Sequence, residues 1–295
     1  MNDEWTQVFA HPSHAVCSDR TLVLTSLDIP HQIVRGDGDF QVVVPPEFAE
    51  RAKFELQEYL RENEPPRRTA RPVDVTYQDA LPGILAYIGT IGLFAWLAGE
   101  AAFGRDWLAA GRIDGRLLRD GELWRPFTAL TLHLDLKHLL GNMGFGALFG
   151  FFAGRLAGPG VGWLTVVVAA ALANGINTLL LDPAHRSIGA STAVFAALGQ
   201  LAGFAWRAKL LSQERWPYRL GPIIGGVALL AYTGTGDANT DIGAHLAGFV
   251  CGFATGVLLT RVAQHFPSTK LQLACGVSAV AIVIVAWIQA LLHWA

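Results

Sequence analysis

The chain has 295 residues, of which 52% are hydrophobic and 16% are charged, and its mean hydropathy is +0.36. A soluble domain of this length does not normally hide so much apolar surface, so we expect lipid to cover part of it. The formal net charge of -2 excludes the broad basic field of a nucleic-acid-binding protein. The three cysteines, Cys17, Cys251 and Cys275, form no close-spaced pair and therefore indicate neither a disulfide framework nor a zinc knuckle.

Residues 1–64 have the pattern of a small cytosolic α+β domain. We expect a helix near 15–27, two strands around the turn at 36–39, and an amphipathic helix that opens after Pro46. The segment 65–80 contains PPRRTARP, which breaks this pattern and is typical of a linker. The first residues lack a basic start followed by an apolar run, so we expect no cleavable secretory signal.

From Leu81 onward, apolar stretches of about 20 residues recur, each long enough to cross a hydrocarbon core about 30 Å thick. Residues 81–262 are expected to form a six-span core, and 263–295 a loop with an additional C-terminal span. Lys and Arg gather before the first span and after the fourth and the sixth, which predicts that the N-terminus is cytoplasmic. The long segment 104–133 would then lie outside. We place the spans at 81–103, 134–154, 161–181, 187–206, 219–235, 241–262 and 272–294.

Three reactive side chains, His138, Ser191 and His245, lie about four residues inside the second, fourth and sixth expected spans. These three spans start at the same face of the membrane. The side chains are therefore expected at a comparable depth, roughly 6 Å below the helix starts. Ionisable groups inside spans are costly, and their presence favours a functional site.

Small residues recur at a spacing of four on two of these spans. Such stripes let helix backbones approach closely in lipid, and packing alone is the simplest explanation. Close approach of the two spans would also bring the serine toward the histidine. The sixth span carries Ala244, Gly248, Gly252 and Gly256, and the fourth carries Gly199 and Gly203.

Ser191 and His245 together could form a catalytic dyad. A serine hydroxyl becomes nucleophilic when a base accepts its proton, and a neutral imidazole can do this near pH 7. The structural alternatives are an N-cap for Ser191 and a hydrogen-bonded histidine within a helix bundle for His245.

Acyl transfer also needs hydrogen-bond donors that face the developing oxyanion. His138 and Asn142 are four residues apart and share one face of the second span. The amide of Asn142, an imidazole N–H of His138 and the backbone N–H of Ser191 could therefore converge on that oxygen. Interhelical hydrogen bonding by a buried Asn142 is the alternative.

Three ordered motifs in this chain resemble those of the rhomboid family of intramembrane serine proteases, over most of the membrane part. DGELWRPFTALTLHLDLKHLLGNM resembles the family's Trp-Arg loop followed by its His-x-x-x-Asn motif. SIGAS resembles the nucleophile motif, and AHLAGFVCG resembles the Ala-His-x-x-Gly motif of the sixth span. The matching positions are Trp124, Arg125, His138, Asn142, Gly189, Ser191 and His245.

The resemblance implies an all-α polytopic membrane protein with a rhomboid-like six-helix core, here followed by a seventh C-terminal span. It also implies serine endopeptidase activity toward single-span transmembrane protein substrates, with Ser191 as nucleophile and His245 as base. Cleavage would occur near the outer face of the membrane and would need no metal or cofactor. We expect a multi-pass protein of the bacterial inner (plasma) membrane, embedded in lipid.

The same resemblance assigns substrate or loop roles to Trp124, Arg125 and Gly189, and a gating role to the fifth span with the loop at 238–240. Among the departures of this chain from the family pattern, one falls in the nucleophile motif. Thr192 follows the nucleophile where glycine is usual. This substitution leaves the efficiency and specificity of cleavage open.

Two other functions are considered. A catalytically inactive rhomboid-like protein would hold or escort membrane clients without cutting them, although such proteins usually lack the serine or the histidine. A transporter or metal-binding membrane protein could use His133, Asp135, His138 and His185 as ligands. The sequence has neither HExxH nor paired Cys/His spacing to support that reading.

Overall fold

The computed structural model describes residues 5–36, 38–63, 79–208, 224–225, 227–228, 241–266 and 268–294. The chain forms two compact units, Met1–Ala70 and Arg71–Ala295. The expected fifth span at 219–235, apart from four of its residues, and the expected gate loop at 238–240 lie outside the described residues.

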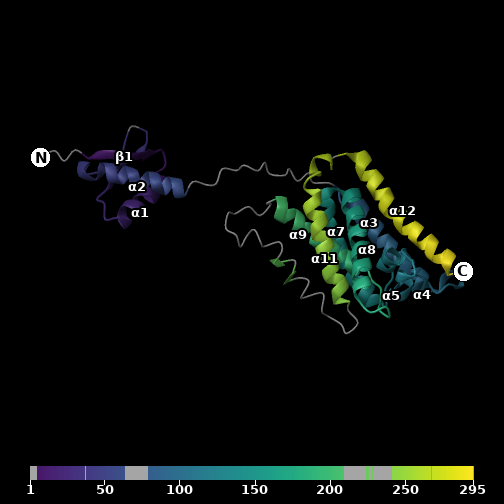
Figure 1. Cartoon of the computed structure of the whole chain (residues 1–295). Helices are drawn as coiled ribbons and strands as arrows, with labels where there is room; N and C mark the ends of the chain where they lie inside the picture. Colours follow the sequence, from purple (N-terminus) through teal and green to yellow (C-terminus); the bar gives the residue numbers. More distant parts are fainter. Residues whose placement is uncertain are drawn as a thin grey trace. The chain divides into compact units, whose positions relative to one another are not determined.

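The described part of the first unit contains three strands, two α-helices and one short 3-10 helix (Figure 1). All strand pairs are antiparallel, in the order β1-β3-β2, so α1 crosses over the central strand to connect the two edge strands. The core is formed by apolar side chains of all these elements, with Val42, Val44 and Leu24 fully buried. The elements are β1 (Thr6–His11), α1 (His14–Ser26), β2 (Gln32–Arg35), β3 (Phe40–Val44), η1 (Pro46–Phe48) and α2 (Ala49–Glu62).

The second unit consists mainly of long helices packed side by side (Figure 1). The long helices are α3 (Leu81–Gly99), α7 (Leu136–Ala157), α8 (Pro159–Leu180), α9 (Ser191–Ala208), α11 (Ile242–Leu259) and α12 (Thr269–His293). Shorter elements are η2 (Ala102–Gly104), α4 (Trp107–Gly111), β4 (Ile113–Asp114), α5 (Gly115–Arg119), α6 (Arg125–Thr128), η3 (Ala129–Thr131), β5 (Arg186–Ser187) and η4 (Ala263–His265).

Among the described residues, five helices are long and apolar enough to cross a membrane: α3, α7, α8, α11 and α12. Their exposed faces carry many large hydrophobic side chains, as expected for helices in contact with lipid. Helix α9 is less apolar because it includes Ser191, Gln200 and Arg207, but it is the most buried of the long helices. The chain is therefore a multi-pass integral membrane protein.

The start of α9 corrects the sequence-based boundary. We expected a helix from residue 187, but α9 begins at Ser191 itself. Ser187 instead pairs with Ile113 in the two-stranded β4–β5 sheet, and Gly189 has a φ of +136°, which interrupts the approach to the helix. The nucleophile candidate therefore lies at the first residue of the helix, not a full turn inside it.

Among the described helices of the second unit, α9 and α11 pack together most extensively, as the small-residue stripes predicted. A Cβ at Gly199 or Gly203 would collide with backbone of α11. A Cβ at Gly252 or Gly256 would collide with backbone of α9. Only glycine allows this separation, so the stripes fix the register in which the two helices meet.

Candidate active site

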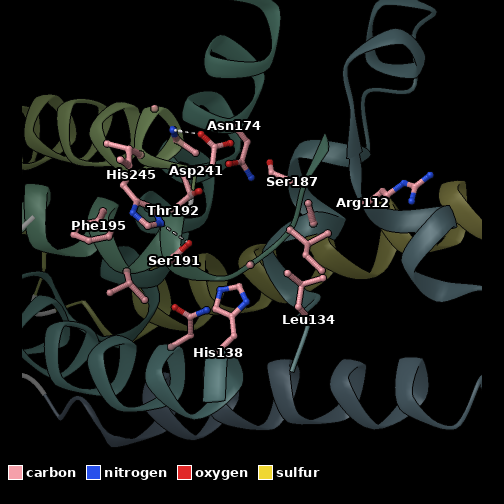
Figure 2. Close-up of a pocket in the computed structure, with 18 of the residues that line it drawn as sticks. Arg112, Leu134, His138, Asn174, Ser187, Ser191, Thr192, Phe195, Asp241 and His245 are labelled. Atoms are coloured by element: carbon pink, nitrogen blue, oxygen red, sulfur yellow. Dashed lines mark hydrogen bonds between the residues drawn. The ribbon is translucent and has the colours of Figure 1, made fainter. Parts of the chain in front are cut away.

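Ser191 and His245 lie in hydrogen-bonding contact where α9 and α11 meet. The distance from Ser191 Oγ to His245 Nε2 is 2.8 Å (Figure 2). His245 is 6% exposed, and its ring packs at 4.5 Å, centroid to centroid, against that of Phe195. Because Phe195 stands one turn after Ser191 on α9, the helix that carries the serine also holds the imidazole in place.

Gly189 makes room for His138 beside the serine. A Cβ at Gly189 would lie 2.8 Å from His138 Cε1 and Nε2, and 3.4 Å from Ser191 Oγ. Together with the positive φ, this crowding restricts the position to glycine. The imidazole of His138 and the hydroxyl of Ser191 therefore border the same small space (Figure 2).

Asn142 follows His138 by about one turn of α7 and is 7% exposed. Its side-chain nitrogen is buried and has no hydrogen-bond partner among the described residues. Its backbone carbonyl accepts a hydrogen bond from the Tyr87 hydroxyl at 2.8 Å. Burying an amide donor without a hydrogen-bond partner costs free energy. An acceptor that enters the site, such as a substrate oxygen, would satisfy this donor and remove that cost.

A cavity of about 1370 Å³ opens at this point. Its walls are contributed by α7, α9, the start of α11 and the connection between α8 and α9. The candidate residues on its wall are His138, Asn142, Gly189, Ser191 and His245.

Thr192 also borders the cavity, but it is 3% exposed. Its Cγ2 would lie 3.2 Å from a Cβ placed at Gly248, so its methyl group packs toward α11. The side chain that replaces the usual glycine thus occupies space between the helices.

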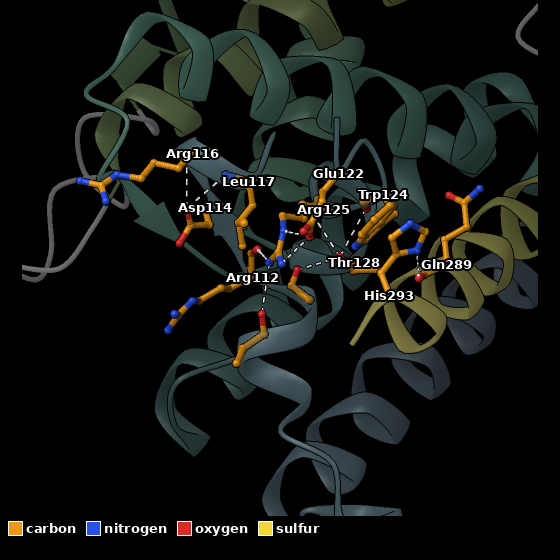
Figure 3. Close-up of polar contacts among 12 residues, drawn as sticks. Arg112, Asp114, Arg116, Leu117, Glu122, Trp124, Arg125, Thr128, Gln289 and His293 are labelled. Atoms are coloured by element: carbon orange, nitrogen blue, oxygen red, sulfur yellow. Dashed lines mark hydrogen bonds and ion pairs between the residues drawn. The ribbon is translucent and has the colours of Figure 1, made fainter. Parts of the chain in front are cut away.

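Trp124 and Arg125, which the resemblance linked to substrate or loop, do not line the cavity. Arg125 is 1% exposed and forms an ion pair with Glu122 at 2.6 Å (Figure 3). Its guanidinium also donates to the carbonyls of Ala109 (3.2 Å) and Arg112 (2.7 Å). A buried cation satisfied in this way organises the segment between α3 and α7.

The strand that leads to Ser191 is tied to the same segment. Arg186 Nε donates to Asp114 Oδ2 at 2.9 Å. Burial alone would raise the pKa of the Asp114 carboxyl, but hydrogen bonds from Arg186 and from two backbone N–H groups, with the charge of Arg186, hold it below its usual range.

A polar cluster that the sequence analysis missed lies at the start of α11. Asp241 accepts hydrogen bonds from the backbone N–H of Ala244 (2.9 Å), from Asn177 Nδ2 (3.1 Å) and from His185 Nε2 (2.9 Å). The signal available in the sequence was an Asp four residues before His245, where a helix N-cap is expected.

The residues considered as metal ligands are used differently. Asp135 accepts from the backbone N–H of His138 and caps α7, while His185 contacts Asp241. His133 is 9% exposed, and its ring packs edge-on against that of His138. Within the described ranges, no group of three His, Cys, Asp or Glu side chains could hold a metal ion.

The fold and the site define a multi-pass membrane protein in which a half-buried serine contacts a buried histidine beside a cavity. Residues 120–262 match the family model described as "Rhomboid domain". The chain therefore belongs to the rhomboid family.

Curated relatives agree with this assignment. "Rhomboid-like protease 2" of Toxoplasma gondii is 32% identical over 155 residues, covering 52% of this chain and 53% of the relative. "Rhomboid protease GluP" of Bacillus subtilis (strain 168) is 30% identical over 154 residues, covering 52% of this chain and 29% of the relative. "Putative rhomboid protease YdcA" of the same species is 30% identical over 144 residues, covering 48% of this chain and 70% of the relative. The matched segment thus spans only about half or less of the first two relatives.

Proposed function

We propose that this chain is an intramembrane serine endopeptidase that cleaves single-span membrane proteins near the outer face of the membrane. The observation that carries the proposal is the 2.8 Å contact between Ser191 Oγ and His245 Nε2 in a cavity bordered by His138 and Asn142. The names of the relatives support the same activity. The N-terminus and the unit that follows it would be cytoplasmic, and the membrane would be the bacterial inner membrane.

In the proposed mechanism, Ser191 Oγ attacks the scissile carbonyl carbon while His245 Nε2 accepts the hydroxyl proton. The carbonyl oxygen becomes an oxyanion, which the Asn142 amide, a His138 ring N–H and the backbone N–H of Ser191 would stabilise. As the tetrahedral intermediate collapses, His245 gives its proton to the leaving amine. Water then attacks the acyl carbon while His245 accepts a proton from it. The bond to Ser191 Oγ breaks, His245 returns the proton to that oxygen, and the acid product is released.

Direct contact between serine and histidine suits a dyad, because the base already lies within reach of the proton it must accept. In a catalytic triad, a third residue orients the imidazole. Here the Phe195 ring and the helix cap at Asp241 would orient it instead. The cavity supplies space for an extended substrate segment and for the hydrolytic water, which the hydrocarbon core lacks.

The test compares purified wild type, Ser191→Ala and His245→Ala in detergent. The substrate is a labelled single-span peptide with small, helix-breaking residues at its outer boundary. We expect wild type to cut it and each substitution to lower kcat by a factor of about 10³ or more. Cutting that survives Ser191→Ala would exclude the mechanism. If all three proteins bind a varied panel of such substrates equally and none cuts, the chain is a client-binding member of the family.

A further inference from the structure

Helix α12 lies beyond the segment that matches the rhomboid domain, and its first turns are firmly attached to the bundle. Gln272 Oε1 accepts from the backbone N–H groups of Gly160 (2.9 Å) and Val161 (3.0 Å). Its Nε2 donates to the carbonyls of Ala157 (2.9 Å) and Phe266 (3.0 Å). One buried amide therefore caps the start of α8 and fixes the start of α12 at the same time.

The last turns of α12 reach the segment between α3 and α7. Trp287 is 3% exposed and stacks on Phe94 at 4.8 Å, with Trp107 at 5.1 Å, between ring centroids. A Cβ at Gly111 would collide with its indole ring. Near the end of the helix, the His293 ring packs at 4.5 Å against that of Trp124 (Figure 3).

The indole N–H of Trp287 donates to Thr131 Oγ1 at 3.1 Å, and both groups are buried. Thr131 ends η3, a single short turn of three residues. Helices of this length are not stable alone and depend on tertiary contacts for their geometry. Trp287 supplies the hydrogen bond by which α12 holds η3.

The other end of η3 is bonded directly to the nucleophile turn. The backbone N–H of Gly189 donates to the carbonyl of Ala129 at 2.9 Å. Gly189 is two residues before Ser191 and adopts the positive φ that makes room for His138. A continuous line of contacts therefore runs from Trp287 through Thr131 and Ala129 to Gly189.

We propose that Trp287 is a positioning residue for Ser191, and that α12 acts as a built-in brace for the loop that shapes the active site. The inference rests on the proposed protease activity. Apolar burial gives helices in lipid little drive to associate, so specific hydrogen bonds and ring contacts determine where α12 binds. Loss of the Trp287 contact would let η3 shift, and with it the Gly189 backbone and the donors around the oxyanion.

The experiment measures kcat and KM for the single-span substrate, the rate at which a fluorophosphonate labels Ser191, and the thermal unfolding midpoint. Trp287→Ala is expected to lower kcat and the labelling rate on the order of tenfold, with KM changed by less than about twofold. Trp287→Phe keeps one aromatic ring in the packing but loses the N–H and part of the indole surface, so it should lie between Trp287→Ala and wild type. The matched control is Trp96→Ala, because Trp96 is 60% exposed on α3 and should leave all three measurements unchanged.

Thr131 tests the hydrogen bond from its other side. Thr131→Ser keeps the hydroxyl and should retain wild-type kcat, whereas Thr131→Val should lower it about as much as Trp287→Phe. Both substitutions remove the Trp287–Thr131 hydrogen bond, and Thr131→Val also removes the bond from Thr131 Oγ1 to the carbonyl of Thr128. The double variant Trp287→Phe/Thr131→Val should therefore lose clearly less kcat than the sum of the two single losses. Additive losses would overturn the direct link, as would unchanged kcat in a folded Trp287→Phe or Thr131→Val protein.

These outcomes are distinct from failure of the proposed function. Wild type that neither cuts substrate nor reacts with the fluorophosphonate at Ser191 overturns both proposals. Active wild type with an equally active, folded Trp287→Ala variant overturns only the brace. If Trp287→Ala does not fold, the Trp287→Phe and Thr131 variants decide.

Discussion

His185 Nε2 is hydrogen-bonded to Asp241 Oδ2 at 2.9 Å, and Asp241 lies one helical turn before His245. The backbone N–H of His245 donates to the carbonyl of Asp241 at 3.1 Å, so Asp241 contributes both its side chain and its backbone to the first turn of α11. Asn177 joins the carboxylate from α8. The base candidate therefore stands on a helix start that three parts of the fold hold together.

Removal of the Asp241 carboxylate should displace that start. Asp241→Ala deletes the cap of α11 and leaves Asn177 and His185 without their acceptor, at a cost of about 1–3 kcal/mol. We expect kcat to fall about tenfold as His245 loses its alignment with Ser191. Asp241→Asn keeps an oxygen for the cap and should lose less. Kinetics and thermal unfolding of the purified variants measure both effects.

Asp79→Ala is the matched control, because the exposed Asp79 side chain accepts a hydrogen bond from the Leu81 backbone N–H at the start of α3 and takes no part in the site. Asp79→Ala should lower the free energy of unfolding by a similar amount and leave kcat unchanged. A comparable loss of kcat in both variants would show that general destabilisation, and not the position of α11, explains the effect.

The separation of α9 and α11 gives a second prediction. A Cβ at Gly252 would collide with the carbonyl of Ala196, so Gly252→Ala must push the helices apart, at a cost of about 1–3 kcal/mol. Because Ser191 and His245 stand on these two helices, we expect fluorophosphonate labelling of Ser191 to slow in parallel.

Gly144→Ala provides the contrast, since no atom lies within 4 Å of a Cβ at that position of α7. Alanine there should stabilise the helix by up to about 1 kcal/mol. Thermal unfolding midpoints should therefore move in opposite directions for the two Gly→Ala changes. Equal midpoints would mean that the close approach does not limit stability.

Asn142 gives a third prediction, specific to the transition state. If its amide donates only to the oxyanion, Asn142→Ala should lower kcat by about 10²–10³ and leave KM nearly unchanged. Tyr87→Phe removes the hydroxyl that donates to the Asn142 backbone carbonyl but leaves the side-chain amide in place. The Tyr87→Phe control should change kcat little. If Asn142→Ala instead raises KM as well as lowering kcat, the amide contributes to substrate binding.

The parts of the fold that could be predicted from the sequence depend on local or periodic features. Apolar stretches near 20 residues predicted the five described spans, whose observed ends differ by a few residues from expectation. Small residues four apart predicted the contact of α9 with α11. Glycine has no Cβ, so a stripe of glycines lets two helix backbones approach without a collision, and this can be recognised in the sequence alone. The same pattern predicted that Ser191 and His245 approach each other.

What could not be predicted depends on contacts between distant segments. The start of α9 is set by the pairing of β5 with β4. Nothing in the sequence around Ile113 or Ser187 indicates that these two residues pair. The segment between α3 and α7 folds into turns of three to five residues that Arg125 holds through carbonyl contacts. Asp241 has the residue type of a helix cap, but its partner His185 is known only from the fold.

His133 supports a prediction about pH. Burial, and secondarily the charge of His138, lowers the pKa of this imidazole from 6.5 to about 4. Since the folded-state pKa is the lower one, the unfolded chain binds the proton first as pH falls below about 6.5. Stability from neutral His133 is therefore present above pH 6.5 and lost progressively down to about pH 4, by up to about 3 kcal/mol.

The measurement is the unfolding midpoint of wild type and His133→Phe between pH 7.5 and about pH 4, a range set by the two pKa values. Phenylalanine keeps a ring beside His138 without a titrating group, so the variant should lose less stability than wild type as the pH falls. Because His133 stays neutral down to about pH 4, it should not set an acid limb of cleavage near pH 6–7, and His133→Phe should leave such a limb in place. Two results would contradict this prediction: parallel curves of stability against pH for the two proteins, or an acid limb of cleavage that disappears in His133→Phe. Either would show that His133 titrates in the folded protein near its ordinary pKa, in a site more accessible to water than its 9% exposure indicates.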